Sequence, residues 1–207
     1  GVCLIDIGAG TCGIAVYDEG KLVHTASLPM GSGNITNDLA IGLQTTPEAA
    51  EHIKRTIGLA LAREAPARET VELRKFDPTL RTSATRRFIA EVIEDRLAEL
   101  FSLVQNELTA IGLGGKLAGG AVLVGGGSKL PGLVSLARQE LKVAAQVGMP
   151  LLTEFDLPDP ELAHVAEDPE MMTVIGLLLS AGDSFKTERP ARSTNNWFSS
   201  IFKHFMP

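Results

Sequence analysis

Cysteine is scarce in this chain: its 207 residues include two, Cys3 and Cys12. These two residues belong to no Cys-x-x-Cys pair, and no histidine cluster lies near them. The sequence therefore argues against a disulfide framework and against a zinc site, and we expect no metal site built from the protein's own side chains. Both thiols are expected to be buried and reduced.

Long apolar runs are also missing. The longest strongly apolar stretch, residues 174–181, is far shorter than the roughly 20 residues that a membrane-spanning helix needs. The net charge of −6 and the isoelectric point near 5.3 disfavour a general nucleic-acid-binding protein, because such proteins are usually basic. With 44% hydrophobic residues, the chain can bury a sizeable core.

The chain opens inside a strand pattern. Residues 2–7 are an apolar run of strand length, and strands are also expected over residues 12–17 and 21–29, with turn residues between them. These three strands predict an antiparallel meander. Because natural proteins seldom begin inside a strand and no initiator methionine is present, we expect the sequence to be a segment of a longer protein. Part of any site would then lie outside it.

The rest of the chain is mostly helical in pattern. Capping residues and apolar periodicity predict helices and a few strands. The expected helices cover residues 36–41, 46–57, 85–108, 133–141 and 171–181, and the expected strands cover residues 71–75 and 121–124.

The first motif that carries chemistry is the turn after the first strand. It contains Asp6, Gly8, Ala9, Gly10 and Thr11. Glycines let backbone N–H groups approach a phosphate closely, and the carboxylate could hold a metal-bound water. Since a strand rather than a helix follows, the pattern disfavours a P-loop or Rossmann turn and favours a hairpin that clamps phosphate. The alternative is an ordinary hairpin turn.

The second motif is a run of three glycines between a strand and a helix, Gly125, Gly126 and Gly127, followed by Ser128. Consecutive glycines cost backbone entropy, so close approach of a flat ligand such as a purine or ribose would explain them. A tight strand-to-helix turn is the alternative explanation.

The third motif lies on a helix, where Glu51, Lys54 and Arg55 share one face. Such a set can hold ribose hydroxyls and the edge of an adenine. The alternative is a solvated face that forms salt bridges.

The order and spacing of these three motifs resemble the second domain of the actin, heat-shock chaperone and sugar kinase superfamily. The resemblance implies an α/β, actin-like ATPase (ribonuclease H-like) fold with a mixed sheet and flanking helices. It also implies ATP with Mg2+ as the cofactor, with the β- and γ-phosphates at the hairpin and the adenosine between the triple glycine and the helix.

Within the superfamily, several stretches are similar to the FtsA family of bacterial cell division proteins: residues 1–11, 36–41, 50–54 and 89–103. This resemblance implies a core subdomain from residues 1–29 and 85–182 and an inserted smaller lobe over residues 30–84. A flexible linker over residues 183–196 and a membrane-targeting helix over residues 197–207 would follow. Ala9 departs from the family pattern, which usually has glycine there, and this puts nucleotide affinity in question.

The end of the chain has an aromatic, amphipathic pattern. At 100° per residue, six apolar side chains fall in one half of a helical wheel. They are Trp197, Phe198, Ile201, Phe202, Phe205 and Met206. This composition is typical of an interfacial membrane anchor, and nearby basic residues favour anionic lipid. The alternative is a helix that docks on the protein itself or in a partner's groove.

The resemblance implies an ATP-binding protein that polymerises and tethers FtsZ to the membrane through its tail. Its partners would be FtsZ, further copies of itself, anionic lipid and other divisome membrane proteins. It would be a peripheral protein on the cytoplasmic face of the plasma membrane at the division site. No side chain is placed as a strong general base, so we assign no catalytic residue and expect at most weak ATPase activity.

Two alternatives belong to other classes. One is an actin-like inner-membrane assembly protein of a type IV pilus or secretion system, which the aromatic tail disfavours. The other is a chaperone or sugar-kinase ATPase. A chaperone should carry a substrate domain after residue 182, where this chain has only a polar stretch and the tail.

Overall fold

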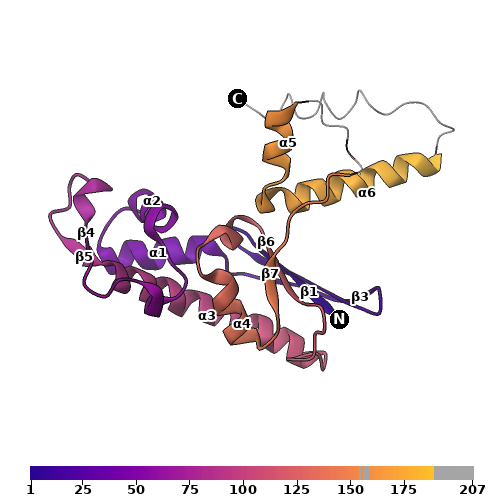
Figure 1. Ribbon diagram of the computed structural model, residues 1–207, viewed down its shortest axis with the longest axis horizontal. Coiled ribbons are helices and arrows are strands. Elements are labelled where there is room, and N and C mark those ends of the chain that lie inside the picture. The colour runs from indigo at the N-terminus through magenta and orange to yellow at the C-terminus, as the bar shows by residue number, and fades with distance from the viewer. Residues whose placement is uncertain (154, 156–158, 189–207) are drawn as a thin grey trace. The chain divides into compact units, whose positions relative to one another are not determined.

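The computed structural model describes residues 1–153, 155 and 159–188, and it divides at residue 148 into two compact units. Figure 1 shows the elements of both units. The expected tail, with Trp197, Phe198, Ile201, Phe202, Phe205 and Met206, lies outside the described residues.

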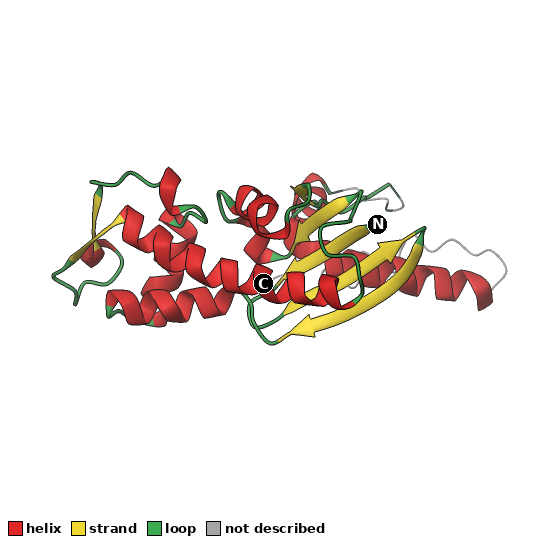
Figure 2. Cartoon of the chain, turned by 90° about the horizontal axis from the view of Figure 1, so that it is seen from below, coloured by secondary structure: helices red, strands yellow, loops and turns green. Residues whose placement is uncertain are grey.

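The first unit is built on a five-stranded mixed sheet with the strand order β3-β2-β1-β6-β7. Its strands are β1 (Val2–Ile7), β2 (Cys12–Asp18), β3 (Lys21–Leu28), β6 (Gly120–Val124) and β7 (Ala145–Val147). β1, β2 and β3 form the expected antiparallel meander, whereas β6 runs parallel to both β1 and β7. The mixed sheet with flanking helices that the sequence predicts is confirmed, and Figure 2 shows helices lying along it. β7 was not expected.

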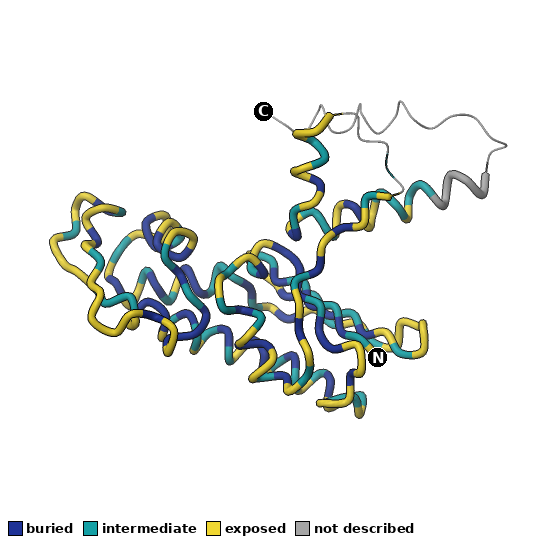
Figure 3. Tube along the Cα trace, in the orientation of Figure 1, coloured by how far each residue is buried: buried dark blue, intermediate teal, exposed yellow. Residues whose placement is uncertain are grey.

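One face of the sheet forms the core. Figure 3 shows buried and less buried residues alternating along the sheet. On β1 every second residue is buried, including Cys3, and on β2 the same alternation runs from Cys12 to Val16. These residues join one apolar cluster with the long helix α3 (Arg86–Ala110), which contributes residues such as Ile93 and Phe101. Burial raises the pKa of both thiols to about 12. The prediction of two buried, unpaired cysteines is therefore confirmed.

In Figure 1 a smaller lobe lies around the N-terminal part of α3, and the five-stranded sheet lies along the C-terminal part of the same helix. The lobe comprises α1 (Ser32–Leu43), α2 (Pro47–Ile57), η1 (Ala62–Glu64), β4 (Thr70–Glu72), η2 (Leu73–Lys75) and β5 (Ser83–Thr85). β4 and β5 form a two-stranded antiparallel sheet. The single strand expected over residues 71–75 is wrong in part, because a 3-10 turn replaces its second half.

The starts of two helices show the role of capping. α1 begins at Ser32, earlier than predicted, because the Asn34 side chain accepts a hydrogen bond from the Gly31 backbone. α3 begins after Thr85, whose hydroxyl oxygen accepts a hydrogen bond from the Phe88 backbone. After β6, η3 (Gly126–Lys129) leads to α4 (Leu133–Leu141), as the glycine-rich turn predicts.

The second unit contains α5 (Pro160–Ala166), η4 (Pro169–Met171) and α6 (Met172–Glu188). The expected linker over residues 183–196 is wrong at its start, because residues 183–188 continue α6. The first proline after this helix begins is Pro190, so no strong helix breaker precedes Glu188. Within the described part of the chain, no helix has the length and apolarity needed to cross a membrane.

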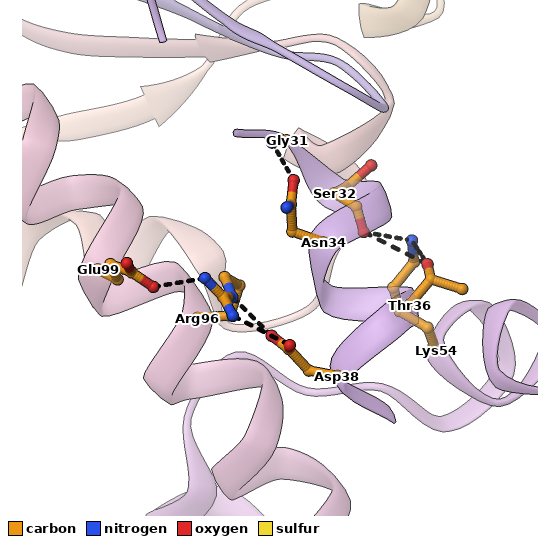
Figure 4. Close-up of polar contacts among 8 residues, drawn as sticks. All are labelled: Gly31, Ser32, Asn34, Thr36, Asp38, Lys54, Arg96 and Glu99. Atoms are coloured by element: carbon orange, nitrogen blue, oxygen red, sulfur yellow. Dashed lines mark hydrogen bonds and ion pairs between the residues drawn. The ribbon is translucent and has the colours of Figure 1, made fainter. Parts of the chain in front are cut away.

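A bidentate ion pair joins α1 to α3. Arg96 donates through Nε to Asp38 Oδ2 at 2.5 Å and through Nη2 to Asp38 Oδ1 at 3.0 Å (Figure 4). Its remaining nitrogen donates to Glu99 on the next turn of α3. The Arg96 and Asp38 side chains are only about a quarter exposed (26% and 27%), so water screens this pair less than it would screen a surface pair.

Replacing Arg96 with Met should lower the free energy of unfolding by about 1–3 kcal/mol, because Asp38 then lacks its charged partner. The matched control is Arg87→Met on the same helix. Arg87 pairs with Glu91 where both side chains are half exposed, so this change should cost about 0.5 kcal/mol or less. Urea unfolding of both variants measures the difference. Equal losses would mean that the α1–α3 pair adds nothing beyond an ordinary surface pair.

Candidate functional site

The structure brings the first two motifs together. β1 and β6 are parallel neighbours, with Asp6 opposite Val124, so the turns that follow them lie at the same edge of the sheet. A Cβ at Gly125 would stand 2.3 Å from Asp6 Oδ1, and one at Gly127 would stand 2.4 Å from the Ile7 side chain. Gly125 also has a φ of +81°. Packing against β1 therefore explains these two glycines without a ligand, whereas Gly126 is exposed.

Ser128 supports this turn from within. Its side chain is buried, and its hydroxyl donates to the Gly125 carbonyl at 2.7 Å. The backbone N–H of Ser128 donates to the same oxygen at 3.0 Å. In this structure the Ser128 hydroxyl therefore closes the glycine turn.

The first hairpin is held by the start of α1. Its turn is closed by a hydrogen bond from the Gly8 N–H to the Thr11 carbonyl at 3.0 Å. The Gly8 carbonyl accepts from the Ser32 N–H at 2.8 Å, and the Ala9 carbonyl accepts from the Gly33 N–H at 2.7 Å. Free N–H groups in the first turn of a helix need acceptors, and here the hairpin supplies two of them.

This arrangement orients the amides of the hairpin. The described peptide bonds include no cis bond, and in a trans peptide the C=O and the following N–H point in opposite directions. Because the Gly8 and Ala9 carbonyls point toward α1, the N–H groups of Ala9 and Gly10 point away from it. Ala9, Gly10 and Thr11 are exposed. Two successive N–H groups on one exposed side are a suitable arrangement for an anion.

Ala9 fits this turn without backbone strain. The described non-glycine residues with positive φ are Glu19, Gln44 and Lys142, so Ala9 does not need the conformation that favours glycine. Its methyl group therefore does not disturb the turn that orients these amides.

The third motif is divided between an exposed part and a buried part. α2 begins after Thr46, whose hydroxyl oxygen accepts from the Ala49 N–H. Arg55 is exposed, and the Glu51 side chain is 42% exposed. The Lys54 side chain, by contrast, is only 9% exposed. The structure therefore leaves Glu51 and Arg55 accessible to a ligand but turns Lys54 inward.

The Lys54 ammonium lies among three oxygen atoms, shown in part in Figure 4. Its Nζ is 2.9 Å from the Ser32 carbonyl, 2.8 Å from Thr36 Oγ1 and 2.6 Å from Glu51 Oε2. Thr36 in turn donates to the same Glu51 oxygen. Ser32 and Thr36 were not among the predicted site residues, because a backbone carbonyl and a buried threonine carry no distinctive pattern.

These contacts control the charge of Glu51. Burial by itself would raise the pKa of this carboxyl. The hydrogen bonds from Lys54 and Thr36, together with the positive charges of Lys54 and Arg55, outweigh burial, and the pKa of Glu51 is lowered. The carboxylate is therefore ionised at neutral pH.

Replacing Gly31 with Ala should break the contact between α1 and the hairpin. A Cβ at Gly31 would lie 2.6 Å from the carbonyl oxygens of both Gly8 and Ala9, and neither backbone oxygen can move freely. The φ of Gly31 is −151°, so the cost comes from this overlap and not from backbone conformation. We expect a loss of about 1–3 kcal/mol in chemical denaturation.

The control for that experiment is Gly10→Ala, because a Cβ at Gly10 has no neighbour within 4 Å. Its stability should stay within about 0.5 kcal/mol of the parent protein. A Gly31→Ala variant as stable as Gly10→Ala would contradict the close contact.

Comparison with known proteins agrees with this architecture. Residues 3–176 match the family described as "Cell division protein FtsA". FtsA of Pseudomonas aeruginosa is 38% identical over 86% of this chain and 42% of its own length. FtsA of Bacillus subtilis is 36% identical over 86% of this chain and 38% of its own length, and FtsA of Escherichia coli K12 is 33% identical over 97% and 50%. The chain thus spans about two-fifths to one half of the length of these relatives.

Solved structures show the same fold at lower identity. MreB5 of Spiroplasma citri bound to AMPPNP aligns with a TM-score of 0.67 and 18% identity, over 90% of this chain and 54% of MreB5. A PilM–PilN type IV pilus biogenesis complex aligns with a TM-score of 0.61 and 24% identity, over 86% of this chain and 45% of the matched one. The actin-like α/β fold is confirmed. The match over residues 3–176, together with these relatives, shows that the chain belongs to the FtsA family of cell division proteins.

Proposed function

We propose that this protein binds ATP at the hairpin of Gly8 to Thr11, forms filaments and attaches FtsZ to the cytoplasmic face of the plasma membrane at the division site. Membership of the FtsA family supports the role in cell division. Because the chain spans half or less of its relatives' length, this function belongs to the whole protein, and the chain contributes part of the nucleotide site.

The observation that carries the nucleotide proposal is the orientation of the hairpin. The Gly8 and Ala9 carbonyls, which would repel a phosphate, are bound to the first turn of α1. The N–H groups of Ala9 and Gly10 are thereby turned to the opposite, exposed side. The hairpin therefore fits the β- and γ-phosphates of ATP.

The other residues fit the rest of the nucleotide. Glu51 and Arg55 are accessible on α2 for the ribose and adenine, and Gly126 is exposed in the second glycine turn. The described residues contain no group of three His, Cys, Asp or Glu side chains arranged to hold a metal ion. In this proposal Mg2+ arrives with the phosphates, and Asp6 holds one of its waters. Bound ATP would act mainly as a ligand that controls conformation and assembly into filaments.

Filament formation and membrane attachment complete the proposal. A MamK double helical filament has a related fold (TM-score 0.54, 14% identity, over 82% of this chain and 53% of MamK), which is consistent with assembly from copies of this fold. The aromatic half of the tail is proposed to enter anionic lipid, and other divisome membrane proteins are proposed partners. Family membership favours this function over that of a pilus or secretion assembly protein.

A charge change at the hairpin tests the nucleotide site. Gly10→Glu should lower ATP affinity about tenfold or more, because like charges about 4 Å apart cost on the order of 1–4 kcal/mol. Gly10→Gln is the control of nearly equal size without the charge, and it should lose less. Calorimetric titration of the intact protein with ATP and with adenosine measures both. Equal ATP affinity in the two variants would place the phosphates elsewhere.

A second experiment tests the tail. Trp197 is the only tryptophan in this sequence, so its emission should shift to the blue when anionic vesicles are added. Phe202→Glu should release the protein from vesicles without lowering its melting temperature. Ser200→Glu adds the same charge to the opposite half of the helical wheel and should weaken binding less. A Phe202→Glu protein that stays bound, or that melts much earlier, would favour the docked-helix alternative.

A further inference from the structure

We propose that Lys54 is a positioning residue that holds the phosphate hairpin through the start of α1, and that it is not itself a ligand of the nucleotide. The inference rests on the proposed nucleotide site at Gly8 to Thr11. It assigns different roles to Glu51 and Lys54, which the sequence places in one motif.

The surroundings of Lys54 are the first argument. An ammonium group has three N–H donors, and Nζ of Lys54 has three acceptors within 2.9 Å: the Ser32 carbonyl, Thr36 Oγ1 and Glu51 Oε2. The residue is 7% exposed. A hydrogen bond to a ribose hydroxyl would require one of these contacts to break inside a buried site, where an unmet polar group is costly.

The second argument is the position of Ser32, whose backbone bonds in two directions. Its carbonyl accepts from Lys54, and its N–H donates to the Gly8 carbonyl at 2.8 Å. The next residue, Gly33, donates to Ala9. A single residue, Ser32, therefore connects Lys54 to the hairpin that carries the proposed phosphate-binding amides.

The third argument is that Lys54 fixes α1 at two heights. Ser32 and Thr36 are separated by one helical turn, and both accept from the same ammonium. Two anchors one turn apart restrain both rotation and sliding of the helix. The Asp38–Arg96 pair restrains α1 from the side of α3 (Figure 4). α1 is therefore held from α2, from α3 and from the hairpin.

These contacts couple the two ends of the proposed nucleotide site. On one side of Lys54 lies Glu51, whose carboxylate remains accessible for the ribose. On the other side, through Ser32, lies the hairpin proposed for the phosphates. Loss of Lys54 should loosen the hairpin, and binding of the phosphates should suffer more than binding of the adenosine.

Hydrogen exchange tests the restraint in the protein without nucleotide. In Lys54→Met, the amides of Ser32 and Gly33 should exchange about tenfold faster or more, because the start of α1 separates from the hairpin more often. The amide of Ala121, which is bonded to the Ala144 carbonyl, serves as the reference and should not change. Arg55→Met removes a neighbouring exposed charge and should leave the Ser32 and Gly33 amides unchanged.

Nucleotide titration of the intact protein separates positioning from direct contact. In Lys54→Met the ratio of ATP affinity to adenosine affinity should fall about fivefold to tenfold, equivalent to about one hydrogen bond. A residue that contacts the ribose directly would lower both affinities by the same factor. Equal factors, or unchanged exchange at Ser32 and Gly33, would overturn the proposal.

A gentler variant covers the case in which Lys54→Met does not fold. Thr36→Val keeps the shape of the side chain and removes one of the three acceptors, so it should speed exchange at Ser32 and Gly33 by a smaller factor. No selective change in this variant would also overturn the proposal. If the parent protein bound neither ATP nor adenosine, the proposed function would fail, while the exchange experiment would still decide the restraint.

Discussion

The candidate site depends on two hydrogen bonds, from the Ser32 and Gly33 N–H groups to the Gly8 and Ala9 carbonyls. The start of a helix has N–H groups without partners, and a hairpin tip has carbonyls without partners. Each satisfies the other here. The result is a turn whose outward side presents N–H groups. A loop without these two hydrogen bonds would not fix the direction of its N–H groups.

This contact also explains the two glycines at the start of α1, the cap residue Gly31 and Gly33 in the first turn. A Cβ at Gly31 or Gly33 would lie 2.6 Å or 2.8 Å from the Ala9 carbonyl oxygen, so the backbones can approach only without side chains. The segment reads as a loop in the sequence, because Gly, Ser and Asn are turn formers. The structure shows that the helix already begins there, which is why the predicted start of α1 was late.

The sequence predicted the parts that depend on local patterns. An apolar run of strand length located β1, the turn residues around it located β2, and a capping threonine located the starts of α2 and α3. The sequence did not predict β7, because this strand has only three residues and depends on tertiary partners. These partners are β6 and the side chain of Arg138, which donates to the Ala145 carbonyl. The resemblance implied that the hairpin and the glycine turn serve one nucleotide, and the structure adds that close packing against Asp6 itself requires Gly125.

The buried position of Lys54 shows why the spacing of residues along a helix cannot assign a separate role to each residue of a motif. Glu51 and Lys54 are one turn apart on α2, and both suit a ribose, but their surroundings differ. Lys54 faces a backbone carbonyl and a threonine from α1, and a buried ammonium is stable only when such acceptors are present. Because α1 is also bonded to the hairpin and to α3, a ligand that moved the hairpin would have to move α1 or break these bonds. The buried lysine thus ties the geometry of the proposed phosphate clamp to the smaller lobe.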